Sequence, residues 1–357
     1  MMRTWINRSL WTTLATLEIM SIGLLVSGCN NNGNNANATK LNAGGATFIY
    51  PMMAKWASEY NKAKGVEVAY ASTGSGAGKA QMIEMTIDFG CSDAPLNEEE
   101  IKKANASKGE VIHVPLAMGA VVPAYNLDEV KDKPIRFTGD VLADIYLGKI
   151  KKWNDTRIQA SQEPGVVMPD KEIVVVHRSD GSGTTYIWVD YLAKQSEEWK
   201  KGPGVGSTIK WPAGVGQQGN EGVTAHVKQT PGAIGYVELI YALQNKVKYG
   251  SVKNKEGHFV EADMKAVTAA AAGALTSIPD DLRYSLTDAP GKDAYPISGT
   301  NWAILYVDPP SGKGKAIYDY LWWVTHDGQS LCEALHYARL PQDLISRVEK
   351  QMEKIKK

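Results

Sequence analysis

The sequence predicts an α/β protein with two lobes, and three observations support that prediction. Segments typical of strands and helices alternate along the chain from about residue 41, as they do in proteins with parallel α/β sheets. A strand followed by a Gly/Ser turn and a helix occurs twice, at residues 66–86 and 173–193. The length of 357 residues allows about two domains. We therefore expect each Gly/Ser turn to lie in a different lobe and both to face one cleft.

The N-terminal segment predicts export. Arg3 and Arg8 precede an apolar stretch at residues 19–26, which is followed by Ser27, Gly28 and Cys29. A basic start, a short apolar run and small residues are typical of a secretory signal, and the run is too short to span a membrane. The position of Cys29 resembles the end of a bacterial lipoprotein signal. This implies a signal peptide at residues 1–28 and a lipid on the Cys29 sulfur; the alternative is an ordinary signal peptide with an incidental cysteine.

The residues after Cys29 predict a tether. Residues 29–40 are rich in asparagine and carry no hydrophobic pattern, which is typical of a flexible segment. A lipid on Cys29 would then hold the chain at a membrane, in the periplasm or at the cell surface. Cys91 and Cys332 are far apart in apolar contexts, so we expect two buried thiols, with a disulfide as the alternative.

The charge of the chain is balanced. The sequence has 39 Lys and Arg against 39 Asp and Glu, and without residues 1–28 the counts are 37 and 38, because Arg3, Arg8 and Glu18 are lost. This balance favours neither a nucleic-acid partner nor a polybasic membrane patch. An anion would have to be captured by local geometry.

The first half of the chain contains several predictable elements. An apolar stripe at Met53, Trp56 and Tyr60 predicts a helix that stops at Gly65, and alternation predicts a strand at residues 66–70. A Gly/Ser turn at 72–78 leads into a predicted helix at 79–86, and residues 88–95 predict a strand and a turn. Asn97 and Glu100 predict a capping box for the next helix.

The second half continues the alternation. Residues 111–125 predict an extended segment that crosses between domains, and residues 295–307 predict another extended segment. We expect strands at 173–176 and 232–237 and a loop at 202–222. The expected helical segments are 136–159 (largely helical), 184–193, 266–274 and 317–340 (mostly helical).

The turn at residues 178–184 predicts an anion site. A strand that passes through a Gly/Ser turn into a helix directs backbone N–H groups into one small space, and the helix dipole adds positive charge there. Ser182 and Thr184 add hydroxyl donors, and Arg178 adds a fixed charge. This chemistry suits a tetrahedral oxyanion. In the alternative interpretations, Arg178 only pairs with Asp180 at the surface, and the two hydroxyl residues only cap the helix.

Other site types are not supported. The segment 74–80 lacks two residues of a nucleotide P-loop, since Thr73 and Ala80 stand where Gly and Ser or Thr belong. No serine has the Gly-x-Ser-x-Gly pattern of a nucleophile elbow. The six histidines show no metal-ligand spacing, and His177 reads as a strand-end residue. We therefore expect no metal and no cofactor.

Several motifs in one order resemble a known family. They comprise Thr47-Phe48, residues 74–76, 88–95, 145–150, 178–184 and 231–238. Together they resemble the PstS-like phosphate-binding proteins of bacterial high-affinity phosphate ABC importers, from about Asn42 to the end and weakly over 244–288. The resemblance implies a two-lobed periplasmic-binding-protein fold, type II-like, with a cleft between lobes joined by crossing hinge strands. We expect lobe I at 41–117 and 298–357, and lobe II at 118–297.

The resemblance also implies a set of phosphate ligands. The matching positions are Thr47, Phe48 through its backbone N–H, Ser75, Asp93, Arg178, Ser182, Gly183 through its backbone, and Thr184, with Asp180 orienting Arg178. The chain departs from the family at Ile49, at Gly76-Ala77 and at Cys91. Asp93 would accept the proton that phosphate keeps near neutral pH and would repel fully deprotonated sulfate. Its alternative is a turn residue before Ala94-Pro95.

The predicted function is that of a non-enzymatic receptor. An exported, lipid-anchored monomer would capture inorganic phosphate and deliver it to the permease subunits of an ABC importer. One alternative is a secreted phosphohydrolase that uses the same anion cradle, although the sequence offers neither a metal nor an activated nucleophile. Another alternative is a receptor for a different tetrahedral oxyanion.

Overall fold

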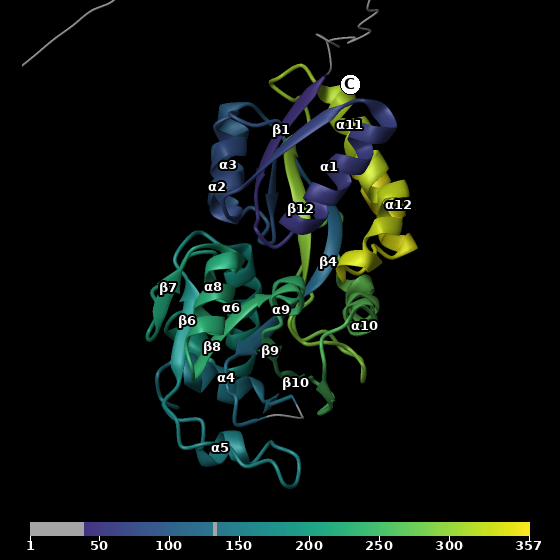
Figure 1. Ribbon diagram of the computed structural model, residues 1–357. Coiled ribbons are helices and arrows are strands. Elements are labelled where there is room, and N and C mark those ends of the chain that lie inside the picture. Colours follow the sequence, from purple (N-terminus) through teal and green to yellow (C-terminus); the bar gives the residue numbers. More distant parts are fainter. Residues whose placement is uncertain (1–38, 131–133) are drawn as a thin grey trace, which may run out of the picture. The chain divides into compact units, whose positions relative to one another are not determined.

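A mixed sheet extends through both lobes of the computed structural model, which describes residues 39–130 and 134–357 (Figure 1). Over these residues the sheet has nine strands in the order β2-β1-β3-β12-β4-β8-β6-β7, with β9 paired to β4. The strands are β1 (Lys40–Gly45), β2 (Glu67–Ser72), β3 (Phe89–Ser92), β4 (Val111–Tyr125), β6 (Val174–Arg178), β7 (Val215–Gln217), β8 (Ala233–Glu238), β9 (Lys248–Tyr249) and β12 (Ser298–Tyr306). A small second sheet contains β5 (Arg136–Phe137), β10 (Ser251–Lys253) and β11 (Phe259–Val260).

Strand direction separates the lobes from the strands that join them. β1 is parallel to β2 and β3 in the first lobe, and β6 is parallel to β7 and β8 in the second. The two long strands β4 and β12 are antiparallel to each other. β4 pairs with β12 from Val111 to Ala120 and then with β8 from Val121 to Tyr125, so one strand passes from lobe to lobe. The two-lobed α/β prediction is confirmed, and the predicted parallel pairing holds within each lobe but not for the crossing strands.

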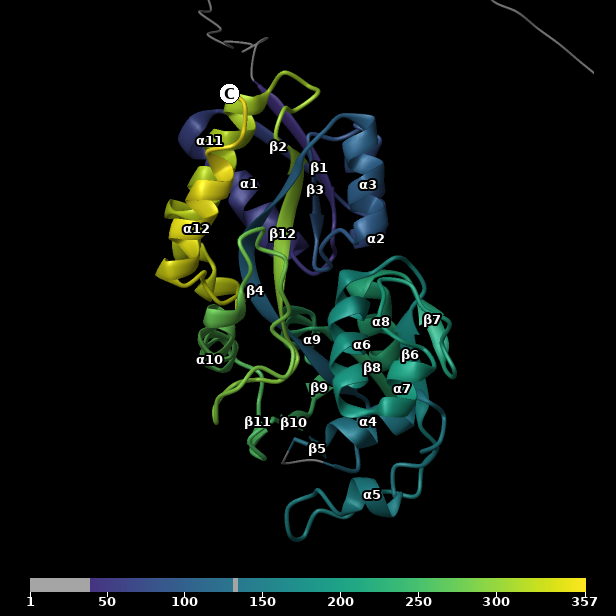
Figure 2. The ribbon, with the colours of Figure 1, turned by 180° about the vertical axis from the view of Figure 1, so that it is seen from behind.

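The helices of the first lobe cover both faces of its sheet. They are α1 (Tyr50–Lys64), α2 (Ser75–Ile83), α3 (Glu98–Ser107), α11 (Gly314–Thr325) and α12 (Gln342–Met352), with 3-10 turns at Asp327–Leu331 and Glu333–Leu335. α2 and α3 lie on one side of the strands, and α1, α11 and α12 lie on the other (Figures 1 and 2). The predicted stripe of α1 is buried, and Gly65 ends that helix with φ of 69°. Asn97 and Glu100 form the predicted capping box of α3.

The remaining helices belong to the second lobe and the region of the crossing strands. They are α4 (Gly139–Tyr146), α5 (Thr156–Gln159), α6 (Gly183–Gln195), α7 (Glu197–Lys201), α8 (Gly219–Gln229), α9 (Leu239–Asn245) and α10 (Met264–Ala274), with a 3-10 turn at Leu275–Ser277. An aromatic cluster joins α4, α6 and β8: the Trp188 ring stacks on Tyr236 at 5.2 Å and lies 5.3 Å from Tyr146. This buried cluster fixes the end of β6 on which the predicted anion site lies.

Three predicted elements differ from the structure. The helix expected at 79–86 is α2, which begins four residues earlier because Gly74, at φ of 93°, completes the turn inside the Gly/Ser segment. The stretch 136–159 is helical only in α4 and α5, since Gly148 at φ of 73° follows the end of α4 and Asp155 caps α5. The loop expected at 202–222 contains β7 and the start of α8.

Both described cysteines are free and buried, as predicted. Burial raises the pKa of the Cys332 thiol to about 12, which makes it a poor nucleophile at neutral pH. The predicted signal peptide, Cys29 and all but the last two residues of the predicted tether lie outside the described residues. Among the helices that are described, none has the length and apolar character needed to cross a membrane.

Candidate functional site

The two predicted Gly/Ser turns lie directly against each other. The Gly76 N–H at the start of α2 donates to the Gly181 carbonyl oxygen of the second lobe at 2.8 Å. A Cβ added to Gly183 would lie 2.5 Å from Oδ2 of Asp93, so backbone and side chain are packed across the lobe boundary. The turns that follow β2 and β6 therefore form one buried polar site.

Arg178 is the cation of this site. It is the last residue of β6, and its side chain is 1% exposed. Its Nε donates to Oδ1 of Asp180 at 2.7 Å, and one terminal nitrogen pairs with Oδ2 of the same carboxylate. The pairing with Asp180 predicted as an alternative thus exists, but it is buried rather than at the surface. The other terminal nitrogen approaches the Thr184 hydroxyl at 3.5 Å, so one edge of the guanidinium points toward the start of α6.

Asp180 holds Arg178 in position and is itself fixed by a hydrogen bond from the backbone. Its Oδ1 also accepts a hydrogen bond from the Gly219 N–H at 3.1 Å. Burial opposes ionisation of this carboxyl, but the hydrogen bonds and charge of Arg178 outweigh burial and keep the pKa of Asp180 below its ordinary value. Asp180 is therefore ionised at neutral pH, and the pair presents an oriented guanidinium.

The start of α6 supplies neutral donors. Ser182 is the N-cap, and its hydroxyl oxygen accepts from the Thr185 N–H at 3.0 Å. Gly183 and Thr184 are the first helical residues, so their N–H groups have no acceptor within the helix. Thr184 is not the cap, and its Oγ1 accepts from Asn220 Nδ2 at 3.1 Å. The cap interpretation thus holds for Ser182 only, and the helix directs its positive end into the site.

Two turns of the first lobe, after β1 and before α2, contribute Thr47, Phe48 and Ser75. Thr47 and Phe48 lie between β1 and α1, and both are buried. The Thr47 carbonyl oxygen accepts from the Tyr241 hydroxyl at 2.6 Å, which fixes the peptide that carries the Phe48 N–H. Ser75 is the first residue of α2, which has Gly74 as its N-cap and no side-chain cap. The start of α2 therefore also leaves backbone N–H groups without a partner inside the helix.

Asp93 lies where the lobes meet. It follows β3 and is 1% exposed, so it is not a surface turn residue. Its Oδ1 accepts from Asn301 Nδ2 at 2.7 Å, and its Oδ2 lies 3.4 Å from the Ser75 hydroxyl. Burial raises the pKa of Asp93 to about 7, although Asn301, Arg178 and Ser75 each oppose that rise. A carboxyl with this pKa exchanges a proton near neutral pH.

Two asparagines of the site were not predicted. Asn220, fully buried near the start of α8, donates from Nδ2 to Thr47 Oγ1 at 2.8 Å and to Thr184 Oγ1 at 3.1 Å, linking the two lobes. Its Oδ1 accepts from the Glu238 N–H at 2.9 Å, which fixes the amide orientation. Asn301 lies on the crossing strand β12. The only sequence signal for Asn220 is the Gly219-Asn220 turn chemistry in a segment predicted as a loop, and Asn301 has none.

The departures from the family pattern lie beside the predicted ligand residues. A Cβ on Gly76 would lie 3.0 Å from Gly181 Cα, so this glycine permits the close approach of the lobes. Ile49 is the buried N-cap residue of α1, with an ordinary φ of −92°. The Cys91 carbonyl oxygen accepts from the Ala46 N–H at 2.9 Å, a contact made by its backbone.

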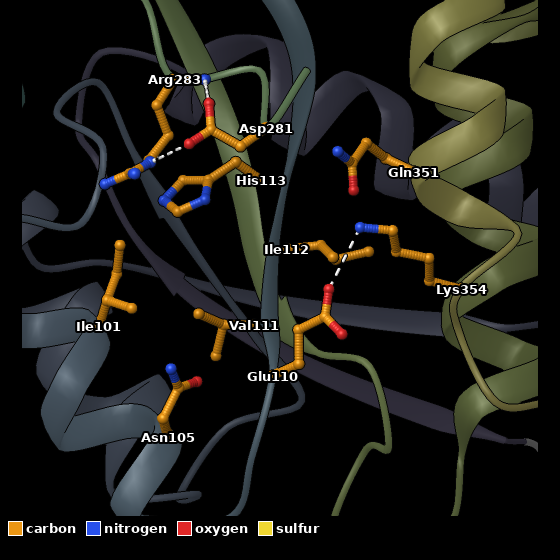
Figure 3. A pocket seen from close by; sticks show the side chains of 10 residues that line it. All are labelled: Ile101, Asn105, Glu110, Val111, Ile112, His113, Asp281, Arg283, Gln351 and Lys354. Atoms are coloured by element: carbon orange, nitrogen blue, oxygen red, sulfur yellow. Dashed lines mark hydrogen bonds and ion pairs between the residues drawn. The ribbon is translucent and has the colours of Figure 1, made fainter. Parts of the chain in front are cut away.

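A second cavity, of about 160 Å³, lies beside α3, the start of β4 and α12 (Figure 3). Its charges are paired, Glu110 with Lys354 at 3.1 Å and Asp281 with Arg283 at 2.7 Å. His113 Nε2 accepts from the Leu96 N–H at 3.0 Å, and burial lowers the pKa of this imidazole to about 3. The role of His113 is therefore structural. Within 39–130 and 134–357, no three His, Cys, Asp or Glu side chains are grouped to hold a metal.

Comparisons with known proteins identify the family of this chain. The model of the PBP superfamily domain matches residues 30–327. The chain is 41% identical to a phosphate-binding protein PstS from Xylella fastidiosa, over 94% of this chain and 96% of that protein. It is also 41% identical to a PstS from Pasteurella multocida, over 88% of this chain and 90% of that protein.

A solved structure supports the fold independently. It is a putative phosphate ABC transporter substrate-binding protein with bound phosphate from Clostridium perfringens, at a TM-score of 0.62 and 20% identity, covering 85% of this chain and all of that one. At this identity the likeness concerns the fold alone. Through the family model and the close relatives together, the chain belongs to the PBP superfamily and, within it, to the phosphate-binding proteins PstS.

Proposed function

We propose that this protein is a receptor that captures inorganic phosphate for an ABC importer. One observation carries the proposal: a buried guanidinium, Arg178, and a buried carboxyl, Asp93, belong to one site between the lobes. A carboxyl beside an anion is unfavourable unless the anion carries a proton to share. Phosphate near neutral pH keeps a proton, whereas sulfate does not.

We assign the ligand groups as follows. Arg178 supplies the charge, and Asp180 orients it. Neutral donors surround the anion: the hydroxyls of Thr47, Ser75, Ser182 and Thr184, and the backbone N–H groups of Phe48 and Gly183. The burial of these residues supports binding of a dehydrated ion, since the helix starts and hydroxyls replace its water shell. Asp93 shares the remaining proton.

In this proposal the neutral donors bind the oxyanion, and the proton shared with Asp93 selects phosphate over other oxyanions. If Asp93 is ionised, it accepts the proton of phosphate, and if it is protonated, it donates to an oxygen of the anion. Its pKa near 7 makes these two forms close in free energy at neutral pH. A fully deprotonated oxyanion binds only when Asp93 is protonated. The site is therefore selective for phosphate when Asp93 is ionised.

No bond is made or broken in this proposal. The relatives are named as binding proteins, which supports a receptor rather than a phosphohydrolase. The lobes would close on phosphate and open again at the permease, as hinge domains do around a ligand. We propose that the protein acts as a monomer.

We also propose where the lobes divide and how the chain is held. Lobe I comprises 41–117 and 298–357, and lobe II comprises 118–297. The change of partner in β4 after Ala120 supports a boundary close to residue 117, and β12 begins at Ser298. Cys29 would carry a lipid after removal of residues 1–28, which holds the receptor at the extracytoplasmic face. The superfamily match begins at residue 30, which supports this division.

Two experiments test these proposals. Calorimetric titration of ligand-stripped protein near pH 8.5, where Asp93 is ionised, should give one tight site for phosphate and far weaker binding of sulfate. Absence of phosphate binding would reject the receptor. For the anchor, mass spectrometry of the membrane fraction should find lipid on Cys29, and an unmodified protein released into the medium would reject it.

A further inference from the structure

The side chain of Asn301 enters the site from an irregular point of the crossing strand β12. The pairing of β12 with β4 changes register between Asn301 and Trp302. The extra residue of this bulge is Leu116 on β4, which lies opposite Asn301 and Trp302, and bulges are frequent beside functional sites. Asn301 is fully buried and reaches Asp93, which lies 208 positions earlier in the chain.

The contacts of the Asn301 amide are one-sided. Nδ2 donates to Oδ1 of Asp93 at 2.7 Å, whereas Oδ1 of Asn301 is buried with no hydrogen-bond partner. A buried amide oxygen without a partner is unfavourable, and such groups call for an explanation. A leucine at position 301 would have a similar shape and would bury no unpaired oxygen. The advantage of asparagine over leucine here is therefore the Nδ2 donor.

The Asn301 donor also divides the two oxygens of Asp93. Oδ1 is occupied by the amide. Oδ2 lies 3.4 Å from the Ser75 hydroxyl and within 2.5 Å of the point that a Cβ on Gly183 would occupy. Oδ2 is therefore the oxygen beside the starts of α2 and α6, where the donors of both lobes converge.

We propose that Asn301 is a positioning residue that holds Asp93 ionised, with Oδ2 turned toward the ligand, and so sets the pH below which the site admits fully deprotonated oxyanions. This inference rests on the proposed phosphate receptor and names what controls its selectivity. A hydrogen bond to a carboxylate favours the charged form. Without that bond, Asp93 would keep its proton at higher pH and could donate it to sulfate.

The direction of the pH effect follows from the groups around Asp93. Arg178 from β6 stays charged throughout, because guanidinium is not deprotonated in proteins. Burial raises the pKa of Cys91, Tyr70 and Tyr337 above ordinary values that are already well above 7, so these three are uncharged near neutral pH. Burial also raises the pKa of the neighbouring Glu238 carboxyl. Asp93 is the group of this cluster whose pKa lies at about 7. Above that pH sulfate meets a carboxylate, and below it sulfate meets a donor.

The test is a direct calorimetric titration with sulfate at pH values from 5.5 to 8.5. Sulfate is the probe because its own charge is constant over that range. In the wild-type protein, sulfate binding should strengthen as the pH falls through about 7. In Asn301→Leu, the midpoint should move upward by about one pH unit, with roughly tenfold tighter sulfate binding at pH 8.5. Thr300→Val, a matched change on the same strand that removes a bond to Tyr284 instead, should leave the midpoint in place.

The outcomes separate this inference from the proposed function. If the wild-type protein binds no phosphate, the receptor itself is wrong. If it binds phosphate but the Asn301→Leu midpoint equals that of the wild-type protein, Asn301 is only structural. Asn301→Ala provides a second variant should leucine prevent folding. The wild-type sulfate profile needs no variant, and a flat profile from pH 5.5 to 8.5 overturns the inference by itself.

Discussion

The two Gly/Ser turns share a strand–turn–helix design but present opposite chemistry. The second-lobe turn follows Arg178 and is completed by a side-chain cap, Ser182 on the Thr185 N–H. The first-lobe turn has no side-chain cap and lies beside the Asp93 carboxyl. One turn therefore offers a fixed positive charge, and the other offers a group whose charge depends on pH.

This difference indicates that the two lobes have different roles in binding. In the proposed receptor, attraction to any oxyanion would come from the second lobe, because Arg178 and the start of α6 act on all such ions alike. Discrimination would come from the first lobe, because Asp93 responds to a proton on the ligand. The close contact of Gly76 with Gly181 would place the bound anion against both lobes at once.

Removing the charge of the second lobe should have the largest effect. Arg178→Met should weaken phosphate binding about a thousandfold, or about 4 kcal/mol, because it also leaves Asp180 buried without its partner. Titration calorimetry measures the change. Arg157→Met, which removes an arginine on α5 that pairs with Asp155 and Asp144, should bind phosphate normally. Equal affinities in the two variants would contradict the role of Arg178.

Preventing contact between the two Gly/Ser turns should have the second-largest effect. Gly183→Ala would place a methyl group 2.5 Å from Oδ2 of Asp93, so the lobes could not pack as they do. We expect about a hundredfold weaker phosphate binding, from about 1–3 kcal/mol of overpacking.

Small-angle scattering with and without phosphate should show reduced compaction for Gly183→Ala. The matched control is Gly222→Ala, where the added Cβ has 3.5 Å to its nearest neighbour, on Gln217. A Gly183→Ala variant that compacts and binds like the control would argue against lobe contact in the bound form.

Changing the discriminating group should have a smaller effect on phosphate but a qualitative effect on selectivity. Asp93→Asn removes the carboxylate and keeps the shape, so phosphate affinity should fall about tenfold, or about 1.5 kcal/mol. Sulfate should now bind at pH 8.5, where the wild-type carboxylate would repel it, and the pH dependence of sulfate binding should disappear. Titration with both anions measures this. Unchanged selectivity would remove Asp93 from the site.

The smallest expected effect concerns a strap, defined as residues 281–287, that contacts both lobes. On one side Arg283 donates to the Leu96 carbonyl oxygen at 3.2 Å. On the other side the Ser285 hydroxyl donates to Asp190 of α6 at 2.6 Å, and Thr287 donates to the same carboxylate.

Loosening this strap should speed release of phosphate. Thr287→Val should raise the dissociation rate about threefold, because the hydroxyl loses its hydrogen bonds to Asp190, Lys194 and Ser285. Stopped-flow fluorescence would follow release through the tryptophans. Thr268→Val, whose hydroxyl donates only within α10, is the control. A rate equal to that of the control would mean that the strap does not hold the closed form.

The predictable part of the fold was local. The stripe of α1, the Gly65 stop, the capping box of α3 and both Gly/Ser turns are patterns within a few residues, and each was found at or near its expected position. α9, α12 and the small sheet were not predicted, because their short apolar patterns depend on what they pack against. The start of α8 was not predicted for the same reason, so Asn220, its second residue, was not recognised as part of the site.

The sequence by itself determined the α/β class, the two turns and the residue types at their ends, because hydrophobic period, glycine and capping chemistry act over one turn of chain. The tertiary structure decided which groups meet. Asn220 lies 173 positions from Thr47 and Asn301 lies 208 from Asp93, and no local pattern specifies either pair. It also decided the raised pKa of Asp93, since the loss of water around a carboxyl is a property of the closed packing and not of its neighbours in the chain.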